Sequence, residues 1–531
     1  MNLPENRRTS PRNKVHAAQT RSPSGLLKAA RSIMGAMQQI FTDTRALDAR
    51  ARESYGLTED IMMENAAAAL EQAVLAHCGS STDVHLNRAA VLVLAGGGNN
   101  GADGYALARR LSSGAIGVTV CAVAEPKSAP CVAQKERAAR LGVRFIRVEE
   151  LDAYLEETSI DLKVIADCMF GSGFHGSLPP EAAAAAMAAN ACRDAYKVAC
   201  DIPSGLDADG NAAGTVFRAD ETVAMGALKM ALYSDLAKDA AGRISIAGLG
   251  VSRTAFEDSS AAAQLLQEGD LRLPHRPRQQ VHKGSFGHVA AVMGQKPGAA
   301  LIAATAALRF GAGLVTVVQQ AESAVQVPFE LMTAPDIPQG TAALALGMGL
   351  GRDNRAADSC CGWLREHKDV PCVLDADICY APALHTLLQE RAKGIVLTPH
   401  PKEFAALLEI CGLGSYRTQD IAQSRTALMR RFCDSFPEAV LLLKGANSFI
   451  GTRHRGEAAM RLYVNTLGTS ALAKAGSGDV LGGMTAALLA QGYVPLEAAT
   501  AASLAHALAA RRVQADYALT PLTLIEKTAE L

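Results

Sequence analysis

Apolar residues recur along the first half of the chain in short continuous runs. These runs cover residues 91–95, 118–123, 143–148, 164–166, 198–200, 222–225 and 244–246. Runs of this length that are rich in β-branched residues predict strands buried on both faces. Because helical patterns lie between several of them, we expect a parallel sheet with helices on both faces. Helices are also predicted from Gln38 through Ala51 and from the MMENAA segment (62–67) onward.

The second half shows the same alternation. Strands are predicted at 288–293 and 314–318 with a helix over 298–310 between them, and further apolar runs cover 372–374, 395–397 and 440–443. The strand pattern stops between Val251 and Val281, where a charged stretch with prolines predicts a linker. We therefore expect an α/β protein with one domain over residues 37–255 and a second over 262–531.

Length and composition agree with this division. A chain of 531 residues is too long for one core, and 49% hydrophobic with 20% charged residues is typical of a soluble globular protein. The formal net charge of −1 provides no bulk attraction to nucleic acid or to an anionic membrane. The 12 cysteines include no CxxC pair, which favours buried, reduced thiols in a cytoplasmic protein.

The first 36 residues differ from the rest, because they are basic and rich in serine and proline. We predict a disordered basic extension over 1–36. A targeting segment and a start codon further downstream remain as alternatives. Deleting residues 1–33 is expected to leave activity intact, since the segment has no apolar periodicity with which to pack on a core.

The stretch Gly476, Ser477, Gly478, Asp479 opens an apolar helical pattern. A helix start leaves backbone N–H groups unpaired and carries the positive end of the helix dipole, so this stretch predicts a site for an anion such as phosphate. Asp479 would move a proton beside that anion. The alternative is that the glycines form only a tight turn and that Asp479 only caps the helix.

Polar residues also follow three predicted strands of the second half. Asp375 and Asp377 end the run 372–374, His400 and Glu403 follow 395–397, and Lys444 ends 440–443. Because the carboxyl ends of parallel strands line one crevice, we expect these side chains to converge on one ligand. The alternatives for each taken singly are turn formers for Asp375 and Asp377, a strand-end histidine for His400 and a solvated edge residue for Lys444.

In the first half, residues 96–104 read GGGNNGADG and are expected to form a loop before a helix over 105–111. Glycines at this place let the backbone approach a dinucleotide pyrophosphate, although the pattern is not GxGxxG. Its asparagines and aspartate predict ligand contacts and oxygen ligands for a cation. Asp167, Asp201 and Ser204 follow two further strands, where turn and helix caps are the alternative reading.

Both halves resemble known families. HKGSFG (282–287), GMGLG (347–351), LDAD (374–377), TPHPKEF (398–404), LKGANS (443–448) and AGSGDVL (475–481) are similar, in this order, to the motifs of NAD(P)H-hydrate dehydratases, which have a ribokinase-like α/β fold. MMENAA, GGGNNGADG and the segments at Asp167 and Asp201 resemble the YjeF N-terminal domain, a Rossmann-like three-layer α/β/α domain whose enzymatic members are NAD(P)H-hydrate epimerases. Ala102, Met348 and Ala475 depart from the usual glycine, proline and glycine of these motifs.

For the first half, the resemblance implies that Asp201 is the catalytic acid/base and that K+ is held by Asn100, Asp167 and Ser204. The residues implied to bind the hydrated dinucleotide are Asn99, Asn100, Gly101, Ala102, Asp103, Gly171, Ser172, Gly173, Phe174, His175, Gly176, Ser177 and Asp201. A scaffold without activity is the alternative for this domain, and the presence of both Asp167 and Asp201 argues against it.

For the second half, the resemblance implies that Asp479 is the base. The residues implied to face the hydrated dinucleotide are Ala299, Gly349, Gly351, His400 and Asp479, and those implied to bind the adenine nucleotide are Lys444, Gly445, Ala446, Asn447, Ser448 and Gly478. ADP or ATP would activate the hydroxyl as a phosphate, with Mg2+ near carboxylates such as Glu403.

The resemblance thus implies a bifunctional repair enzyme for hydrated NADH and NADPH. The first half would interconvert the R and S hydrates, and the second would dehydrate the S form. A small-molecule or vitamin kinase with a fused ligand-binding domain is the alternative, and a nucleotide-binding regulatory protein is a third. We expect small-molecule substrates, no nucleic-acid or membrane partner, and a homo-oligomer.

Overall fold

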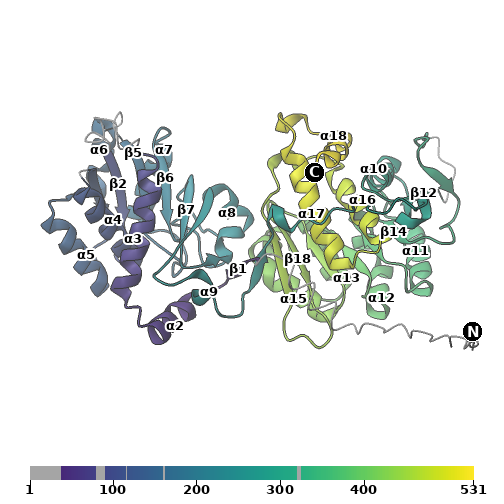
Figure 1. Cartoon of the computed structure of the whole chain (residues 1–531), viewed down its shortest axis with the longest axis horizontal. Helices are drawn as coiled ribbons and strands as arrows, with labels where there is room; N and C mark the ends of the chain where they lie inside the picture. The colour runs from purple at the N-terminus through teal and green to yellow at the C-terminus, as the bar shows by residue number, and fades with distance from the viewer. Residues whose placement is uncertain (1–36, 79–89, 115, 159–161, 320–324) are drawn as a thin grey trace, which may run out of the picture. The chain divides into compact units, whose positions relative to one another are not determined.

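The computed structural model describes residues 37–78, 90–114, 116–158, 162–319 and 325–531. Residues 38–531 form one compact unit that contains two sheets. Helices cover both sheets, so the predicted α/β class is confirmed (Figure 1). The predicted extension 1–36 lies outside the described residues.

The first sheet has seven parallel strands in the order β4-β3-β2-β5-β6-β7-β9. They are β2 (Ala90–Ala95), β3 (Gly117–Ala122), β4 (Arg144–Arg147), β5 (Leu162–Cys168), β6 (Tyr196–Cys200), β7 (Glu221–Met225) and β9 (Arg243–Ala247). Each contains most of one predicted apolar run, so the buried parallel sheet is confirmed.

Helices pack on both faces of this sheet. Val91 and Val93 of β2 lie in a cluster with residues of α3 (Glu59–Leu75), α4 (Asn99–Ser113) and α5 (Ala129–Arg140). Leu92 and Leu94 point the other way, into a cluster with residues of α6 (Leu151–Thr158) and α7 (Pro180–Ala191). Alternate residues of a strand face opposite sides, so the continuous apolar run encodes the three layers.

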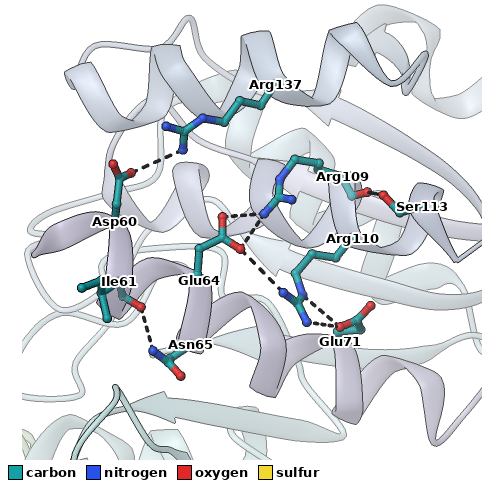
Figure 2. A network of polar contacts seen from close by, with 9 residues as sticks. All are labelled: Asp60, Ile61, Glu64, Asn65, Glu71, Arg109, Arg110, Ser113 and Arg137. Carbon is teal, nitrogen blue, oxygen red and sulfur yellow. Dashed lines mark hydrogen bonds and ion pairs between the residues drawn. The ribbon is translucent and has the colours of Figure 1, made fainter. Parts of the chain in front are cut away.

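Ion pairs between α3 and its neighbours fix its place on this face. Figure 2 shows Arg109 and Arg110 of α4 reaching Glu64 and Glu71 of α3, with N···O distances of 2.5 and 2.7 Å. Arg110 also lies 3.6 Å from Glu64. These contacts hold α3 against the helix whose first turn carries Asn99.

Two predictions for the first half are wrong. Helix α4 begins at Asn99 and not at 105, with Gly98 as its N-cap. A Cβ atom on Gly101 would lie 1.9 Å from the carbonyl oxygen of Gly96, so the glycines fold the expected loop into the first helical turn. The predicted helix from Gln38 is a strand, β1 (Gln38–Phe41), followed by α2 (Arg45–Tyr55). Its extended form depends on pairing with distant strands, which local periodicity does not show.

The second sheet has twelve strands in the order β13-β12-β11-β14-β15-β16-β17-β18-β19-β10-β1-β8. Its parallel part consists of β11 (His288–Met293), β12 (Leu314–Gln319), β13 (Met332–Ala334), β14 (Ala343–Leu346), β15 (Cys372–Leu374), β16 (Ile395–Leu397) and β17 (Val440–Leu443). The remaining strands are β18 (Ser448–Thr452), β19 (Arg461–Asn465), β10 (Ala263–Leu265), β1 and β8 (Leu228–Lys229). Strand β10 lies where the strand pattern was predicted to have stopped, so that prediction is corrected.

Helices also pack on both faces of the second sheet. One face packs in a common core with residues of α11 (Asn354–Glu366), α12 (Pro382–Glu390), α13 (Pro401–Ile410) and α15 (Arg425–Ser435). Helices α10 (Pro297–Arg309), α16 (Ser477–Ala490) and α17 (Pro495–Arg511) contact the strands β11, β14 and β16 respectively. The remaining helices are α8 (Asp235–Ala240), α9 (Arg253–Phe256), α14 (Thr418–Gln423) and α18 (Pro521–Lys527).

Helix α16, which carries the GSGD stretch, is buried along nearly its whole length. A Cβ atom on Gly483 would lie 2.1 Å from the carbonyl oxygen of Ala303, so glycine lets α16 approach α10 closely. Within the described ranges, no helix is both long and apolar enough to cross a bilayer. All 12 cysteines are free, and all except the partly exposed Cys192 are buried, as predicted.

Candidate active sites

A cleft of about 760 Å3 lies at the carboxyl ends of the first sheet. The predicted site residues that line it are Asn99, Asn100, Asp103, Gly171, Ser172, Gly173, Phe174, His175, Ser177 and Asp201. Gly101 and Ala102 do not line it, because they are buried in the first turn of α4. Gly176 is exposed and also lies outside the lining. The structure therefore brings most of the predicted dinucleotide site into one cavity.

Asp201 directly follows β6 and has a φ of 70°, in the left-handed region that residues other than glycine rarely adopt. Its Oδ1 accepts a hydrogen bond from the Met225 N–H at 3.1 Å, and its Oδ2 accepts one from Ser172 at 3.3 Å. The Lys229 ammonium lies 2.6 Å from Oδ1. These contacts hold a carboxylate at the cleft in one orientation, and strained backbone of this kind is often found at functional sites.

Lys229 is a site residue that the sequence analysis missed. Its side chain is only 3% exposed, and its Nζ also donates to the carbonyl oxygen of Met225 at 2.8 Å. A buried lysine requires a partner. A lone lysine in the apolar segment GALKMALY (226–233) was therefore a signal that the sequence did offer.

Two further carboxyl groups surround this pair. Burial, reinforced by the negative charge of Asp201, raises the pKa of Asp103 well above its usual range. Burial also raises the pKa of Asp48 to about 6, although the charge of Lys229 opposes this shift. The cleft thus holds Asp103, a carboxyl group whose pKa is raised by burial, together with Asp201, which is paired with a lysine. Carboxyl groups in different environments are suited to separate acid and base roles.

The residues expected to hold K+ lie around the segment 169–171. Asp167 accepts hydrogen bonds from the Ser204 hydroxyl at 2.6 Å and from the Ser204 N–H at 2.7 Å. Burial raises the pKa of Asp167 to about 6. The Nδ2 atom of Asn100 is buried without a hydrogen-bond partner in the described structure. A Cβ atom on Gly171 would lie 3.4 Å from Asn100 Oδ1. Carboxylate, hydroxyl and amide oxygens are suitable ligands for a hard cation, so the residues fit the ion.

In the second half, Asp479 lies in the first turn of α16. This helix begins after Gly476, which has a φ of 87°. The pKa of Asp479 is raised to about 6, mainly by burial and further by the negative charge of Asp375. The carboxyl group is therefore a base that titrates close to neutrality at the positive end of a helix.

Lys444 joins this helix start to the strand ends. Its Nζ lies 2.8 Å from Asp375 Oδ1 and 3.8 Å from Glu403 Oε2. A Cβ atom on Gly478 would lie 3.1 Å from the same Nζ. Burial alone would lower the pKa of Lys444, but attraction by Asp375 and Glu403 outweighs it and the pKa is raised. The structure thus brings these strand-end residues together beside the GSGD stretch, and the single ligand on which they are expected to converge stays a prediction.

His400 and Glu403 form a cap on α13. Glu403 accepts hydrogen bonds from the His400 N–H at 2.8 Å and from its Nε2 at 2.9 Å, while His400 Nδ1 accepts from the Lys402 N–H at 3.1 Å. Burial would raise the pKa of Glu403, but the hydrogen bond from His400 and the charge of Lys444 lower it. Both oxygens of Glu403 are thus engaged by His400, which does not favour the predicted role near Mg2+.

Ala299 lies in the first turn of α10, which follows β11, and Gly349 and Gly351 follow the neighbouring strand β14. A Cβ atom on Gly349 would lie 3.1 Å from Ala299 Cβ, so the two residues are adjacent. Gly351 has a φ of 91°, and its N–H donates to Asp377 Oδ2 at 2.9 Å. A Cβ atom on Gly476 would lie 3.1 Å from Ile302 of α10, which connects this group to the start of α16.

Within the loop 444–448, the side chain of Asn447 does not point where a nucleotide-binding role would require. This residue is 2% exposed, and its Nδ2 donates to the Tyr233 carbonyl oxygen at 2.9 Å. Its side chain therefore contacts residues of the first half, whereas Lys444 contacts the start of α16. The side chain of Asn447 thus does not favour the expected nucleotide contact, and the nucleotide-binding roles expected for the other residues of 444–448 stay predictions.

His506 is a second residue that the sequence analysis missed. Its Nε2 lies 2.9 Å from the carbonyl oxygen of Ser477 and 3.1 Å from the Ser477 hydroxyl. Complete burial lowers the pKa of His506 to about 4, so the ring is neutral and holds the start of α16 through hydrogen bonds. A single histidine in the alanine-rich α17 gave no signal of this role.

Comparison with known proteins places the chain in a family. A profile described as NAD(P)H-hydrate dehydratase matches residues 289–530, and one described as YjeF-related protein N-terminus matches residues 59–231. The bifunctional NAD(P)H-hydrate repair enzyme Nnr of Helicobacter pylori is 42% identical over 498 residues, which cover 93% of this chain and 100% of that protein. The chain belongs to the bifunctional NAD(P)H-hydrate repair enzyme family. The resemblance of both halves is thereby confirmed.

Other members of the repair-enzyme family match over most of their length. The Moorella thermoacetica enzyme is 32% identical over 87% of this chain and 90% of its own, and that of Leishmania braziliensis is 29% identical over 84% and 85%. Among solved structures, the ADP/ATP-dependent NAD(P)H-hydrate dehydratase from Bacillus subtilis, co-crystallised with ATP/Mg2+, is 23% identical. It covers 49% of this chain and 92% of that chain, with a TM-score of 0.40.

Proposed function

We propose that this family member repairs hydrated NADH and NADPH in two steps. The cleft of the first half interconverts the R and S hydrates, and the site at α16 dehydrates the S form with ADP or ATP. The convergence of Lys444, Asp375 and Gly478 beside Asp479 is the observation that carries the proposal. The predicted homo-oligomer and cytoplasmic location stay predictions.

In the first site, Asp201 is the acid/base that takes up and returns a proton while one bond at the hydroxyl-bearing carbon opens and re-forms on the other face. Lys229, 2.6 Å away, orients the carboxylate and balances its charge. Asp103, whose pKa is raised by burial, lines the same cleft and is the second carboxyl group available to the substrate. The backbone of 171–173 and the side chains of Asn99 and His175 would contact the dinucleotide.

Asn100, Asp167 and Ser204 would hold K+ in this half. The ion would neutralise the buried Asp167 carboxylate and fix the segment 169–171, to which Ser204 is bound by the Phe170 N–H at 2.9 Å. Asn100, whose buried Nδ2 has no hydrogen-bond partner among the described residues, would present its amide oxygen to the ion.

In the second site, the N–H groups at the start of α16 and the ammonium of Lys444 stabilise the negative charge of the nucleotide phosphates. Asp479 takes the proton of the substrate hydroxyl as the terminal phosphoryl group is transferred to it. Loss of the resulting phosphate, together with a proton from the neighbouring ring carbon, then forms the double bond of the dihydronicotinamide ring. His400, Ala299, Gly349 and Gly351 would contact the substrate, with Glu403 holding His400 in place. We assign no step to a Mg2+ ion held by Glu403.

One assay tests the proposal directly. The protein is incubated with a mixture of R and S hydrates of NADH and with ADP or ATP, while the absorbance of the reduced nicotinamide is followed. We expect full recovery of NADH in the presence of nucleotide. Transfer of phosphate to the substrate without recovery of NADH would favour the small-molecule kinase, and nucleotide binding without any conversion would favour a regulatory protein.

A further inference from the structure

A short segment of the first half, residues 233–238, contacts the loop 444–448 of the second half. It begins at the last residue of the 3-10 helix Met230–Tyr233, which follows β8, and it includes the first turn of α8. Strand β8 pairs with β1 and is an edge strand of the second sheet. Strand β17 of the same sheet leads into the loop 444–448. The segment is thereby tied to the sheet that carries the proposed nucleotide site.

Asp235 contacts the loop through one backbone hydrogen bond and through an ion pair with Arg425 of α15, which itself contacts the loop. Its carboxylate pairs with both terminal nitrogens of Arg425, with Nη1 at 2.9 Å from Oδ1. Asp235 Oδ1 also accepts a hydrogen bond from the Asn447 N–H at 3.2 Å, and Arg425 Nη1 donates to the Asn447 carbonyl oxygen at 3.2 Å. The Arg425 side chain is only 6% exposed. Two-pronged pairing of an arginine with a carboxylate fixes geometry as well as charge.

Lys238 binds two strand-end segments at once. Its Nζ lies 2.9 Å from the carbonyl oxygens of Ala446, Thr466 and Gly468, and 3.1 Å from Asn447 Oδ1. Thr466 and Gly468 lie between β19 and α16, in the chain that leads to the GSGD stretch. An ammonium group has three protons and matches such a cage of oxygens. One lysine therefore holds together the loop after β17 and the segment before α16.

The side chains of Arg425 and Asp235 leave no room for a side chain at Gly445. A Cβ atom on Gly445 would lie 2.5 Å from Arg425 Nη2 and 2.8 Å from Asp235 Oδ1. The loop next to Lys444 is thus shaped by the segment 233–238 as well as by its own sequence. We propose that Asp235 and Lys238 are positioning residues for the nucleotide site of the second half. This inference rests on the proposed role of residues 444–448 and Gly478 in binding the nucleotide.

The test uses the full chain with Lys238→Met and Asp235→Asn, which remove the charge and keep the approximate size of each side chain. Asp239→Asn is the matched control, because Asp239 is an exposed aspartate on the same short helix. Direct binding of ADP and of ATP is measured, together with KM and kcat for dehydration of the S hydrate. Thermal unfolding shows that each variant is folded.

We expect each positioning variant to raise the KM for nucleotide about tenfold or more, because a lost charge-assisted hydrogen bond weakens binding to this extent. The kcat at saturating nucleotide should stay within about threefold of the wild-type value, as for a loss of uniform binding. Asp239→Asn should match the wild type. Wild-type KM and affinity for both nucleotides in folded Lys238→Met and Asp235→Asn would overturn the inference and leave the proposed dehydration standing. A wild-type protein without nucleotide-dependent dehydration would overturn the proposed function.

Hydrogen exchange of the unaltered protein tests the same inference without any variant. Saturating ADP should slow amide exchange in residues 233–238 together with 444–448, since the two segments share hydrogen bonds. Helix α5, which lies in the first half away from these contacts, is the internal control. Nucleotide that protects 444–448 and leaves 233–238 unchanged would overturn the inference.

Discussion

The two sites each centre on an aspartate, and the surroundings of the two differ. Asp201 follows a strand in a strained backbone conformation and has a buried lysine 2.6 Å from its carboxylate. Asp479 lies in the first turn of a helix, and the nearby lysine, Lys444, is bound to Asp375 instead. A carboxylate with its own lysine is suited to move a proton back and forth. A carboxylate with a raised pKa beside unpaired N–H groups is suited to deprotonate a hydroxyl next to a phosphate.

The charge pattern explains the difference further. In the first site the lysine is buried with its aspartate, so the pair is locked before any substrate arrives. In the second site, burial and the charge of Asp375 keep the pKa of Asp479 at about 6, while Lys444 is held by two acidic residues next to Gly478. The unpaired N–H groups at the start of the helix supply the partial positive charge that an incoming phosphate complements.

The largest expected effect comes from Asp479→Asn, which keeps the size of the side chain and removes the base. Dehydration of pure S hydrate should fall roughly 10²- to 10⁴-fold, the usual contribution of general-base catalysis. Nucleotide binding and epimerisation should remain, and the variant should be compared with the wild type at saturating ADP. Dehydration at the wild-type rate would contradict the role of Asp479.

Asp201→Asn should produce the opposite result. We expect S hydrate to be repaired at the normal rate and R hydrate only as fast as the two forms equilibrate spontaneously, because the proton carrier of the first site is lost. Mixing this variant with Asp479→Asn should restore complete repair of both hydrates, since a released small molecule diffuses between proteins. Repair of R hydrate by Asp201→Asn alone at the wild-type rate would show that another group moves the proton.

Lys229→Met tests whether the paired lysine distinguishes the two sites. Removal of the ammonium leaves Asp201 without its nearest positive charge, so epimerisation should fall at least about tenfold, as for a lost hydrogen bond to a charged group. Dehydration of S hydrate should be unchanged. Lys135→Met is a matched control, since Lys135 lies on α5 and pairs with the exposed Glu125. Equal epimerase rates in both variants would remove Lys229 from the site.

The pH dependence of the second site should report the raised pKa of Asp479. Because the base must be unprotonated, kcat/KM for dehydration should fall as the pH is lowered through about 6, well above the usual range of an aspartate. The measurement is a pH–rate profile with pure S hydrate at fixed nucleotide concentration. A rate that stays constant down to pH of about 4 would contradict the burial of this carboxyl group.

The smallest expected effect concerns the ion pairs of Figure 2, which support only the first site. Glu64→Gln should lower the free energy of unfolding by about 1 kcal/mol, because partly exposed ion-pair networks contribute on this scale. Epimerase activity should lose thermal stability before dehydratase activity does. Glu53→Gln, an exposed residue of α2, is the control. An equal change in the free energy of unfolding for both variants would mean that the ion pairs of α3 do not stabilise the first half.

The sequence by itself determined the buried strands, the helix at 477–490 and the order of the motifs, because these depend on local periodicity and on residues close together in the chain. The convergence of Lys444 and Asp375 near Gly478 followed from one rule about parallel strands. The start of α4 was predicted too late because the glycines before residue 105 read as a loop. Their place in the first helical turn depends on close contacts such as that of Gly101 with Gly96, which local sequence does not show.

Only the tertiary structure decided which distant residues meet. The pairing of β1 and β8 with the second sheet and the contacts of Lys238 join residues about 200 positions apart in sequence. The partners of Lys229 and His506 depend likewise on how the strands and helices pack. No local pattern encodes such contacts, since their free energy arises from burial and hydrogen bonding that exist only after the sheets have formed.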